Sequence, residues 1–593
     1  MNRTKRIFAI ILCLMMVLTA CITTEQPPKD NGQVENENDK ELTYKAGTYT
    51  ATKTGYGGPL TVEVTVDETT IKDIKLTEFN DTVMVGDQAF ETISKEIIEN
   101  QTLKVDMVSG ATISSAAVIS AVTDALTQAD ANIEALQAIE IPKIAPEKTE
   151  WETDVIVVGS GISGIAAAIE AAENGADVII IEMLGRVGGT SALSAGWVHA
   201  AGTDIQKSLG IEDSAEKFFT DWLTLAARSD ENNVDPEFAR YLTEHSAENI
   251  QWLIDHGVNM IDPFPAGIYD GRNIPRIHQA EGGKGFIIKG IYESAQNLGV
   301  DTHLDTRAME LITEGDNVVG VKAMDKDGNE LIYKAKSVIL ASGGYAGNKE
   351  MMAKYHPAVT NYNNSSVNLG DTLIMGESVG ADIIFQDALL YNHGRAGVGT
   401  SNPNVLNVTP EGVRFHDEAD YFYSSTRALR EAGFEDAYSI VPTSIYEKNK
   451  ESIDIEIERG NAFIADTIEE LATKMDMEPN VLKSTIDKYN EYASTGVDSD
   501  YNKPAEYLLP IEAPYVGVYL IGNLVDTTSS LRINIDAQVI NTEGNVIDGL
   551  YAAGSAAVAQ SYNQEYIGSG AALLNGLTFG RIAGAHAADM LKQ

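Results

Sequence analysis

The sequence has almost no cysteine. Its two cysteines are Cys13 and Cys21, and none occurs beyond position 21 in a chain of 593 residues. Disulfide bonds, cysteine-ligated iron–sulfur clusters and CxxCH haem sites all need thiols elsewhere in the chain. These redox centres are therefore excluded from the main part of the protein.

Basic residues are also scarce. The chain has 43 Lys and Arg against 87 Asp and Glu, which gives a formal net charge of −44. Such a chain would repel the phosphates of nucleic acids, so we expect no nucleic-acid partner. A long apolar run is missing at the N-terminus, where the stretch from Ile7 to Thr19 is too short to be a comfortable spanning helix.

Residues 1–21 have the pattern of a bacterial lipoprotein signal peptide. Lys5 and Arg6 precede the apolar run, which ends in Leu18-Thr19-Ala20-Cys21. This box predicts cleavage before Cys21 and lipidation of its thiol; the alternative is an uncleaved anchor with a chance cysteine. Residues 22–43 are polar and predict a disordered tether. We therefore expect an extracytoplasmic protein that is lipid-anchored to the bacterial cell membrane.

Residues 44–130 predict a small domain of strands and helices. Alternating apolar residues indicate strands at 47–52, 60–66 and 71–76, and helices are expected over 86–100 and 113–128. The second helix follows Ser109-Gly110-Ala111-Thr112. Gly110 and Ala111 leave room for a bulky phosphate, and the helix N-terminus favours its charge. Taken alone, this stretch is also a common turn with a helix cap.

A dinucleotide-binding pattern lies between Thr153 and Glu182. The apolar strand 155–158 leads into the G-x-G-x-x-G of Gly159, Gly161 and Gly164, followed by a helix to about 174 and a strand at 178–181. The first glycine makes the tight turn, the second allows close approach of a pyrophosphate, and the third allows close helix packing. Glu182 is placed to accept the ribose hydroxyls. This part of the chain therefore predicts an α/β, Rossmann-like fold.

Three further segments continue the pattern. They are Gly188-Gly189-Thr190-Ser191, Gly343-Gly344 after the strand 337–340, and Gly554 at the end of residues 549–554. In this order the four pieces resemble the flavoprotein subunit of fumarate reductase and succinate dehydrogenase, with its relatives urocanate reductase and 3-ketosteroid dehydrogenase. The resemblance implies non-covalent FAD. An NAD enzyme is the alternative, although it would not need a C-terminal segment that returns to the cofactor.

The resemblance also implies a domain order. The stretch around Thr112 resembles the FMN-binding domain in which a transferase attaches FMN to threonine through a phosphoester, so Thr112 would carry covalent FMN and an FMN transferase would be needed for maturation. The family implies an α/β and α+β multidomain protein: an FMN-binding domain at 44–130, a linker at 131–150, an FAD-binding domain at 151–384 and 514–593, and a mobile capping domain at 385–513.

The predicted substrate site departs from the fumarate pattern. Fumarate reductases hold a dicarboxylate between cationic and hydrogen-bonding side chains, and an arginine delivers the proton. The matching positions are Phe422 for that arginine, Thr527 or Thr528 for a histidine, and Tyr566 for a carboxylate-binding arginine. Burial of two carboxylates without cations would cost several kcal/mol per charge. We therefore expect that fumarate is not the substrate.

Tyr566 begins a motif that indicates a ketone instead. Residues 566–570, Tyr-Ile-Gly-Ser-Gly, resemble the Tyr-x-Gly-x-Gly of 3-ketosteroid dehydrogenases, in which the hydroxyl and a glycine N–H polarise a substrate ketone. By this resemblance Tyr566 and Gly570 hold the carbonyl oxygen. The alternative is that Tyr566 packs against the flavin and Gly570 only starts the last helix, expected over 571–591. Gly568 and Ser569 are expected to belong to the FAD site, where the helix N-terminus faces the flavin.

The favoured hypothesis is a reductase of an activated C=C bond in which electrons pass from FMN to FAD to an enone or ketosteroid-like substrate. A membrane or extracellular donor would supply the electrons, and no metal is expected. The candidate proton donors are Tyr421, Tyr423, His393 and His278. A second hypothesis is a urocanate reductase-like enzyme for a monocarboxylate, with its cation among Arg395, Arg427 and Arg276. A third is an electron-transfer lipoprotein without its own substrate.

Overall fold

The dinucleotide-binding pattern folds in the computed structural model as its sequence predicts. The strands β5 (Val155–Val158) and β6 (Val178–Ile181) flank the helix α5 (Ile162–Glu173). All residues of both strands are buried, which is typical of parallel strands that are covered on both faces. The strand β14 (Ser337–Leu340) pairs with β5 in parallel.

The structure describes residues 42–143, 145–146, 148–229, 234–265, 274–360, 362–364, 366–386, 389–400, 402–420, 422–563 and 566–592. The predicted signal peptide with Cys21, most of the predicted tether, and Tyr421 lie outside the described residues. Within those ranges, no helix has both the length and the apolar character needed to cross a membrane.

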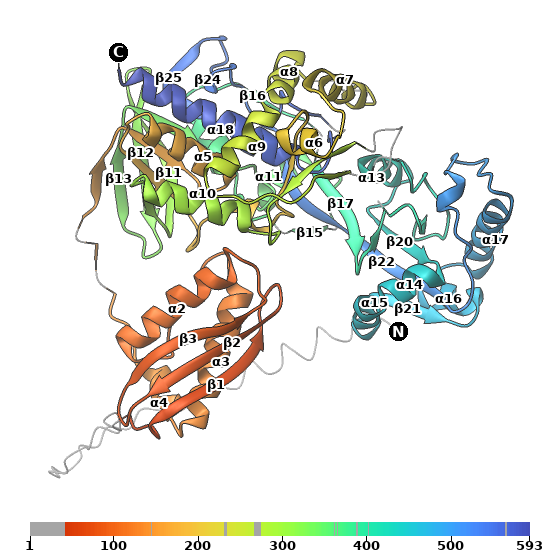
Figure 1. The fold of residues 1–593 in the computed structure, drawn as a ribbon, viewed down its shortest axis with the longest axis horizontal. Coiled ribbons are helices and arrows are strands. Elements are labelled where there is room, and N and C mark those ends of the chain that lie inside the picture. The colour runs from red at the N-terminus through yellow and green to blue at the C-terminus, as the bar shows by residue number, and fades with distance from the viewer. Residues whose placement is uncertain are drawn as a thin grey trace, which may run out of the picture. The chain divides into compact units, whose positions relative to one another are not determined.

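The α/β part is built on a six-stranded sheet. Its strand order is β10 (Asp301–His303), β6, β5, β14, β25 (Val546–Ala552) and β24 (Gln538–Ile540). The C-terminal helix α18 (Ala571–Met590) packs along α5 (Figure 1). Gly580 and Gly584 allow this contact, because a Cβ atom there would lie 2.4 Å from the Ser163 oxygen and 2.1 Å from the Ala167 oxygen. The C-terminal segment therefore returns to the dinucleotide-binding unit.

Two smaller sheets belong to the same part of the chain. One has the order β11 (Thr306–Glu314), β12 (Asn317–Asp325), β13 (Glu330–Lys334) and β4 (Glu150–Glu152). The other has the order β7 (Trp197–His199), β9 (Pro275–Gln279) and β8 (Phe264–Pro265). The first residues of α18 lie against β7, since a Cβ atom on Gly570 would come within 2.8 Å of the His199 nitrogen.

The small N-terminal domain is an antiparallel sheet with helices. The strands β1 (Gly47–Thr54), β2 (Pro59–Val66) and β3 (Ile71–Phe79) pair in chain order. In β2, Leu60, Val62, Val64 and Val66 alternate as buried residues, as the sequence pattern predicts. The helices are α2 (Gly86–Asn100), α3 (Thr112–Gln128) and α4 (Ile133–Ala138), and α3 covers β1 and β2.

A further sheet forms around β22 (Tyr515–Thr527), a strand that begins just after the predicted capping range 385–513. It pairs with three strands of that range, β17 (Leu389–Arg395), β20 (Asp436–Val441) and β21 (Ala462–Ala465), so the sheet extends beyond the predicted boundary. Figure 1 shows these strands with the helices α16 (Ile468–Lys474) and α17 (Pro479–Thr495). Apolar residues at helical spacing over 467–491, interrupted at Pro479, indicate both helices. Leu471, Leu482 and Ile486 belong to their shared core.

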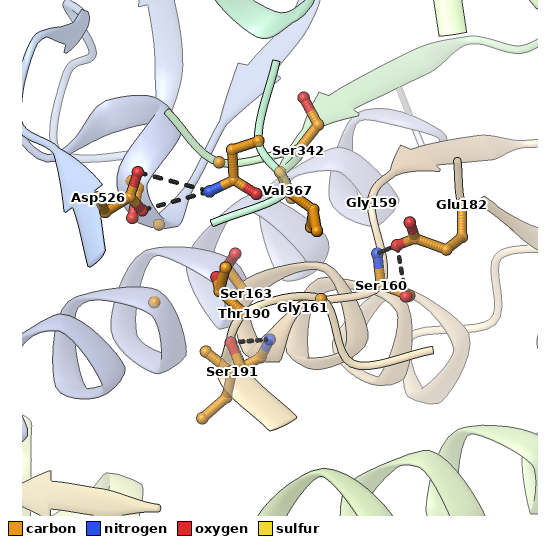
Figure 2. A pocket seen from close by; sticks show the side chains of 18 of the residues that line it. Gly159, Ser160, Gly161, Ser163, Glu182, Thr190, Ser191, Ser342, Val367 and Asp526 are labelled. Carbon is orange, nitrogen blue, oxygen red and sulfur yellow. Dashed lines mark hydrogen bonds between the residues drawn. The ribbon is translucent and has the colours of Figure 1, made fainter. Parts of the chain in front are cut away.

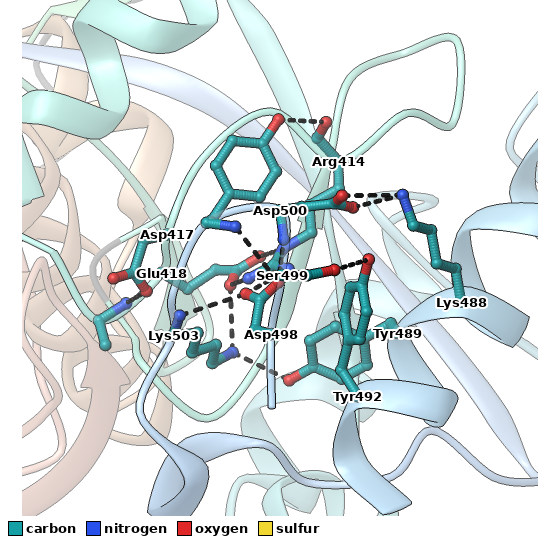
Figure 3. A network of polar contacts seen from close by, with 12 residues as sticks. Arg414, Asp417, Glu418, Lys488, Tyr489, Tyr492, Asp498, Ser499, Asp500 and Lys503 are labelled. Carbon is teal, nitrogen blue, oxygen red and sulfur yellow. Dashed lines mark hydrogen bonds and ion pairs between the residues drawn. The ribbon is translucent and has the colours of Figure 1, made fainter. Parts of the chain in front are cut away.

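A buried network of charges lies inside the predicted capping range (Figure 3). Arg414 donates to both oxygens of Glu418, at 3.0 and 2.7 Å, and to Asp498 at 2.8 Å. Lys503 lies 3.1 Å from Glu418 and donates to the Tyr489 hydroxyl at 2.9 Å. Two cations and two carboxylates therefore balance one another, and they fix the loop that leads into α13 (Phe422–Glu431).

Candidate active site and cofactor sites

The glycines of the G-x-G-x-x-G differ in what surrounds them. Gly159 has φ of 103°, and a Cβ atom there would lie 2.6 Å from the Ala341 oxygen. A Cβ atom on Gly164 would lie 1.9 Å from the Gly159 oxygen. On Gly161 it would meet only the Ser191 hydroxyl, at 3.5 Å. The first and third glycines are therefore required by packing, whereas the second leaves its backbone open to a ligand.

Glu182 lies at the end of β6, where the sequence predicts a ribose acceptor. Its carboxylate is buried and accepts hydrogen bonds from the Ser160 amide at 2.8 Å, from the Ser160 hydroxyl at 2.6 Å and from the Leu184 amide at 2.9 Å. These bonds hold the carboxylate against the glycine loop. Each carboxylate oxygen can accept more than one hydrogen bond, so acceptor capacity remains for a ligand hydroxyl.

One cavity joins the four glycine-containing segments (Figure 2). Glu182 lies on one side of the cavity in Figure 2 and Asp526 on the other, with Ser163, Thr190 and Ser191 between them. The predicted cofactor residues that line it are Gly159, Gly161, Glu182, Gly189, Thr190, Ser191, Gly343 and Gly554. Ala572 and Leu573, in the first turn of α18, close it. The groove combines open backbone, hydroxyls and a helix N-terminus, which fits a dinucleotide.

The remaining predicted cofactor residues are not among those that line the cavity. A Cβ atom on Gly188 would lie 2.8 Å from the Ala192 side chain, and one on Gly344 would lie 2.3 Å from the Thr527 hydroxyl. Gly568 packs on His199, since a Cβ atom on this glycine would lie 2.9 Å from the His199 ring. Ser569 lies between Gly568 and Gly570 just before α18. Packing against neighbouring segments is what these glycines provide.

Thr112 is exposed at the first position of α3, two residues after Gly110 with φ of 79°. Two large apolar side chains of the same stretch of chain, Met107 and Ile113, are also exposed, as is Tyr56, whose amide donates to the Ser114 hydroxyl at 3.4 Å. Uncovered apolar side chains around an accessible hydroxyl fit a covalently held aromatic group. The arrangement therefore suits an isoalloxazine ring attached through Thr112.

The loop before Thr112 contacts the segment that follows Glu182. The Arg186 Nε atom donates to the Gly110 oxygen at 2.8 Å, and Gln88 and Val187 exchange hydrogen bonds through the Gln88 side chain. A Cβ atom on Gly110 would lie 2.9 Å from the Leu184 side chain. The two predicted flavin-binding loops therefore meet in one contact.

Tyr566 is buried and reaches the start of α18. Its hydroxyl accepts a hydrogen bond from the Ala572 amide at 2.7 Å. Burial raises the pKa of the Tyr566 hydroxyl, which keeps it neutral. Gly570, with φ of 96°, is the N-cap of the same helix. The two predicted carbonyl-binding groups therefore belong to one helix terminus.

The two histidines proposed as proton donors are both inside the fold. His278 is fully buried, and its ring nitrogens contact the Thr203 hydroxyl at 2.9 Å and the Arg276 oxygen at 3.0 Å. The Nε2 atom of His393 contacts the Glu435 oxygen at 2.9 Å. Burial lowers the pKa of each ring to about 4, so both are neutral at pH 7. Both ring nitrogens of His278 already have partners, which favours a structural role for this residue over that of a proton donor.

The arginines of the monocarboxylate hypothesis differ in their partners. Arg276 is buried between Asp213, at 2.6 Å, and Asp221, at 2.8 Å. Arg395 pairs with Glu456 at 2.7 Å and donates to the Tyr519 oxygen at 2.9 Å. Both charges are therefore neutralised within the protein. Arg427 lies 4.0 Å from Glu431 and donates to the Arg228 backbone oxygen at 3.5 Å.

Asp526 is a residue that the sequence reasoning missed. Its carboxyl group is buried in the wall of the cavity, where it accepts from the Thr527 amide at 2.9 Å and lies 3.4 Å from the Asn368 amide nitrogen (Figure 2). Burial raises its pKa, although Ser555 and other neutral donors oppose the shift. The sequence signal for this residue is its position, since an acidic residue follows directly after the apolar Leu524 and Val525 of β22.

Comparisons with known proteins match these features. Residues 154–573 match the family model of an FAD-binding domain, and residues 55–127 match that of an FMN-binding domain. A urocanate reductase from Eggerthella lenta is 33% identical over 574 residues, which cover 92% of this chain and 93% of that protein.

Two solved structures have the same fold. The open conformation of a flavocytochrome c3 fumarate reductase aligns with a TM-score of 0.63 and 30% identity, over 75% of this chain and 79% of that one. A 3-ketosteroid-Δ4-(5α)-dehydrogenase from Rhodococcus jostii RHA1, in complex with 4-androstene-3,17-dione, aligns with a TM-score of 0.62 and 28% identity, over 75% of this chain and 99% of that one.

Proposed function

The chain belongs to the FAD-binding domain family and is a flavin-dependent oxidoreductase, and from this premise we propose that it reduces the C=C bond of an α,β-unsaturated ketone. The cavity residues Gly161, Glu182 and Ser191 would hold FAD non-covalently at its pyrophosphate and ribose. When bound, FAD supplies the hydride chemistry. The capping segment 385–513 excludes water from the reaction when it closes.

The observation that carries the ketone proposal is the position of Tyr566 at the start of α18. Reduction of an enone by hydride places negative charge on the carbonyl oxygen, so a donor there stabilises the transition state. The Tyr566 hydroxyl is neutral and held by the Ala572 amide. The Gly570 N–H and the positive end of the helix dipole add to it. Such neutral donors suit a ketone, whose ground state carries no charge to desolvate.

Covalent FMN on Thr112 is the second part of the proposal. Its support is the exposed hydroxyl with the exposed Met107, Ile113 and Tyr56 around it. A transferase would form the phosphoester. Electrons would then pass from FMN to FAD, for which the contact between Gly110 and Arg186 offers a short connection.

The third part concerns the location. We propose lipidation at Cys21 and a membrane or extracellular electron donor, on the basis of the N-terminal lipoprotein pattern. The tether 22–43 would leave the catalytic part free to meet that donor.

The urocanate reductase relative favours a second candidate, an enoate reductase for a monocarboxylate. That substrate needs a cation close to its carboxylate. Arg276 and Arg395 are engaged by carboxylates, so Arg427 would have to supply it. Tyr423, one of the proton donors that the sequence suggests, is on α13 together with Arg427. The side chain of Tyr423 and all of Tyr421 lie outside what the structure describes.

The test is anaerobic reoxidation of the flavin-reduced protein by a panel of enones and enoates. We expect enones to reoxidise it faster than fumarate or urocanate. Tyr566→Phe should lower kcat/KM for an enone at least about tenfold, or about 1.4 kcal/mol of transition-state stabilisation. Tyr562→Phe is the matched control, since this buried ring packs edge-on against Tyr566 at 5.1 Å.

Each other outcome has a distinct meaning. Fast reaction with enoates only, lost on replacement of Arg427 and kept in Tyr566→Phe, would select the enoate reductase. No reaction with any acceptor would favour the electron-transfer lipoprotein. FAD content should stay normal in Tyr566→Phe, because the ring that fills the site remains.

A further inference from the structure

Arg186 is a buried cation for which the described residues provide no carboxylate partner. Its side chain is fully buried, and it donates to the backbone oxygens of Gly110 at 2.8 Å, Val187 at 3.1 Å and Gly189 at 3.2 Å. No ion pair joins it to a carboxylate in the described part of the chain. Arg276 and Arg414, which are also buried, each pair with two carboxylates. Arg186 is therefore the exception among these three.

Burial of an unpaired cation is strongly unfavourable, and backbone oxygens compensate for it only in part. Burial lowers the pKa of Arg186, and the charge of Glu182 opposes that shift. Among the described residues no hydrogen bond or ion pair joins Glu182 to the guanidinium, and the Glu182 oxygens accept from Ser160 and Leu184. Each Nη atom of Arg186 carries a further N–H beyond its bond to a backbone oxygen. A counter-ion with acceptor oxygens would satisfy both the charge and these donors.

The position of Arg186 indicates which anion this is. It joins the loop that ends in Thr112 to Gly189, whose segment lines the cofactor cavity. We propose that Arg186 is the counter-ion of a flavin phosphate at this junction, with the FMN phosphoester on Thr112 as the first choice and the FAD pyrophosphate as the other source. Arginine suits this task because its planar fork matches phosphate oxygens. The inference rests on the proposed function, since it needs bound flavin.

A consequence follows for the stability of the protein. Without flavin, Arg186 stays buried and uncompensated, so its charge weakens the junction. When the phosphate is in place, the charges balance and the two loops are fixed to each other. Arg186 thus acts as a positioning residue, and loading with flavin should stabilise the wild-type protein more than a variant without this charge.

The experiment compares the full-length protein with and without each flavin. Protein produced without the transferase lacks FMN, and protein produced with it is checked by mass for the adduct. Arg186→Gln removes the charge and keeps donors for the backbone oxygens. Gln88→Leu is the matched control, because it removes the Gln88 contacts to Val187 at the same junction and changes no charge. Arg186→Lys restores the charge without the fork.

FMN loading should raise Tm of the wild type and of Gln88→Leu by about 4 °C or more. Arg186→Gln should lose most of this gain, and Arg186→Lys should keep part of it. If Arg186→Gln keeps the FMN gain but binds FAD at least tenfold more weakly, the counter-ion is the FAD pyrophosphate. If neither quantity changes, the proposal is overturned. Should Arg186→Gln not fold, Arg186→Lys decides on the same measurements. Absence of the mass adduct on the wild type would refute the FMN assignment itself.

Discussion

Replacement of Arg414 by methionine tests the charge network of the capping segment. Arg414 makes three hydrogen bonds to Glu418 and Asp498, and its guanidinium lies over the rings of Tyr489 and Tyr501, at 5.3 and 4.9 Å. Methionine fills a similar volume but removes the charge. Glu418 and Asp498 would then share one cation, Lys503, so one buried negative charge would be uncompensated.

The expected loss is about 3–5 kcal/mol, the cost of removing one partner from a buried pair. Summing three charge-assisted hydrogen bonds at about 1.5–3 kcal/mol each would give more. That sum is too high, because the folded protein no longer pays the free-energy cost of desolvating Arg414 once the cation is removed. The double variant Arg414→Met/Asp498→Asn restores charge balance and should recover about 1–2 kcal/mol, within the usual range of coupling between neighbours.

Hydrogen exchange of the α17 amides measures this loss locally. The four tryptophans, at positions 151, 197, 222 and 252, lie outside the capping segment, so their fluorescence does not report its opening. Arg459→Met is the control, since Arg459 is largely exposed and its bond to Glu456, at 2.7 Å, should contribute only about 0–1 kcal/mol. If the opening free energy of α17 changes by less than about 1 kcal/mol in Arg414→Met, the reasoning is refuted.

Three other predictions concern the flavin sites and export. Thr112→Ala should remove the covalent flavin and keep dissociable FAD; a flavin-sized mass adduct on this variant would contradict it. Gly164→Val should abolish FAD binding or folding, because even a Cβ atom would clash with the Gly159 oxygen at 1.9 Å; normal FAD content would disprove the packing argument. Cys21→Ala should release the protein from the membrane fraction or leave its signal uncleaved, and unchanged mass and membrane association would exclude lipidation.

The buried charge network should lose stability as the pH falls. Burial alone would raise the pKa of Glu418, but Lys503 and Arg414 hold it at about 2. Because this value lies below the ordinary one of about 4.3, the stabilisation from Glu418 is complete above that pH and is lost as the pH falls towards 2. The protection of α17 should fall over this window in the wild type and less so in Arg414→Met.

Much of the fold could be predicted because local signals determine it. The strands 155–158, 178–181 and 337–340 occur at the predicted residues, since short, fully apolar runs suit a buried parallel sheet. The last helix begins at Ala571 as predicted and ends at Met590. The first glycine unit could also be interpreted from its spacing alone, because each position has a separate steric task.

The candidate site was less predictable because its properties depend on distant partners. Arg276 is neutralised by Asp213 and Asp221, and Arg395 by Glu456, and no sequence pattern links these residues. Arg186 shows the reverse case: in the part of the chain that the structure describes it donates to backbone oxygens and pairs with no carboxylate, which is visible only once the fold is known. Sequence indicates which residues can carry charge, whereas the fold determines which charges remain available.

Asp526 extends this argument to the choice of substrate. It is a buried carboxyl group on the cavity wall, and its neighbours are neutral donors such as Asn368 and the Thr527 amide. A carboxylate substrate bound nearby would be repelled by any negative charge on this group, and in a region of low dielectric constant it would need a cation of its own. Of the cations considered, two are committed to other carboxylates. A neutral ketone avoids this repulsion, so the charges around the cavity favour the enone over the enoate, in the same direction as Tyr566.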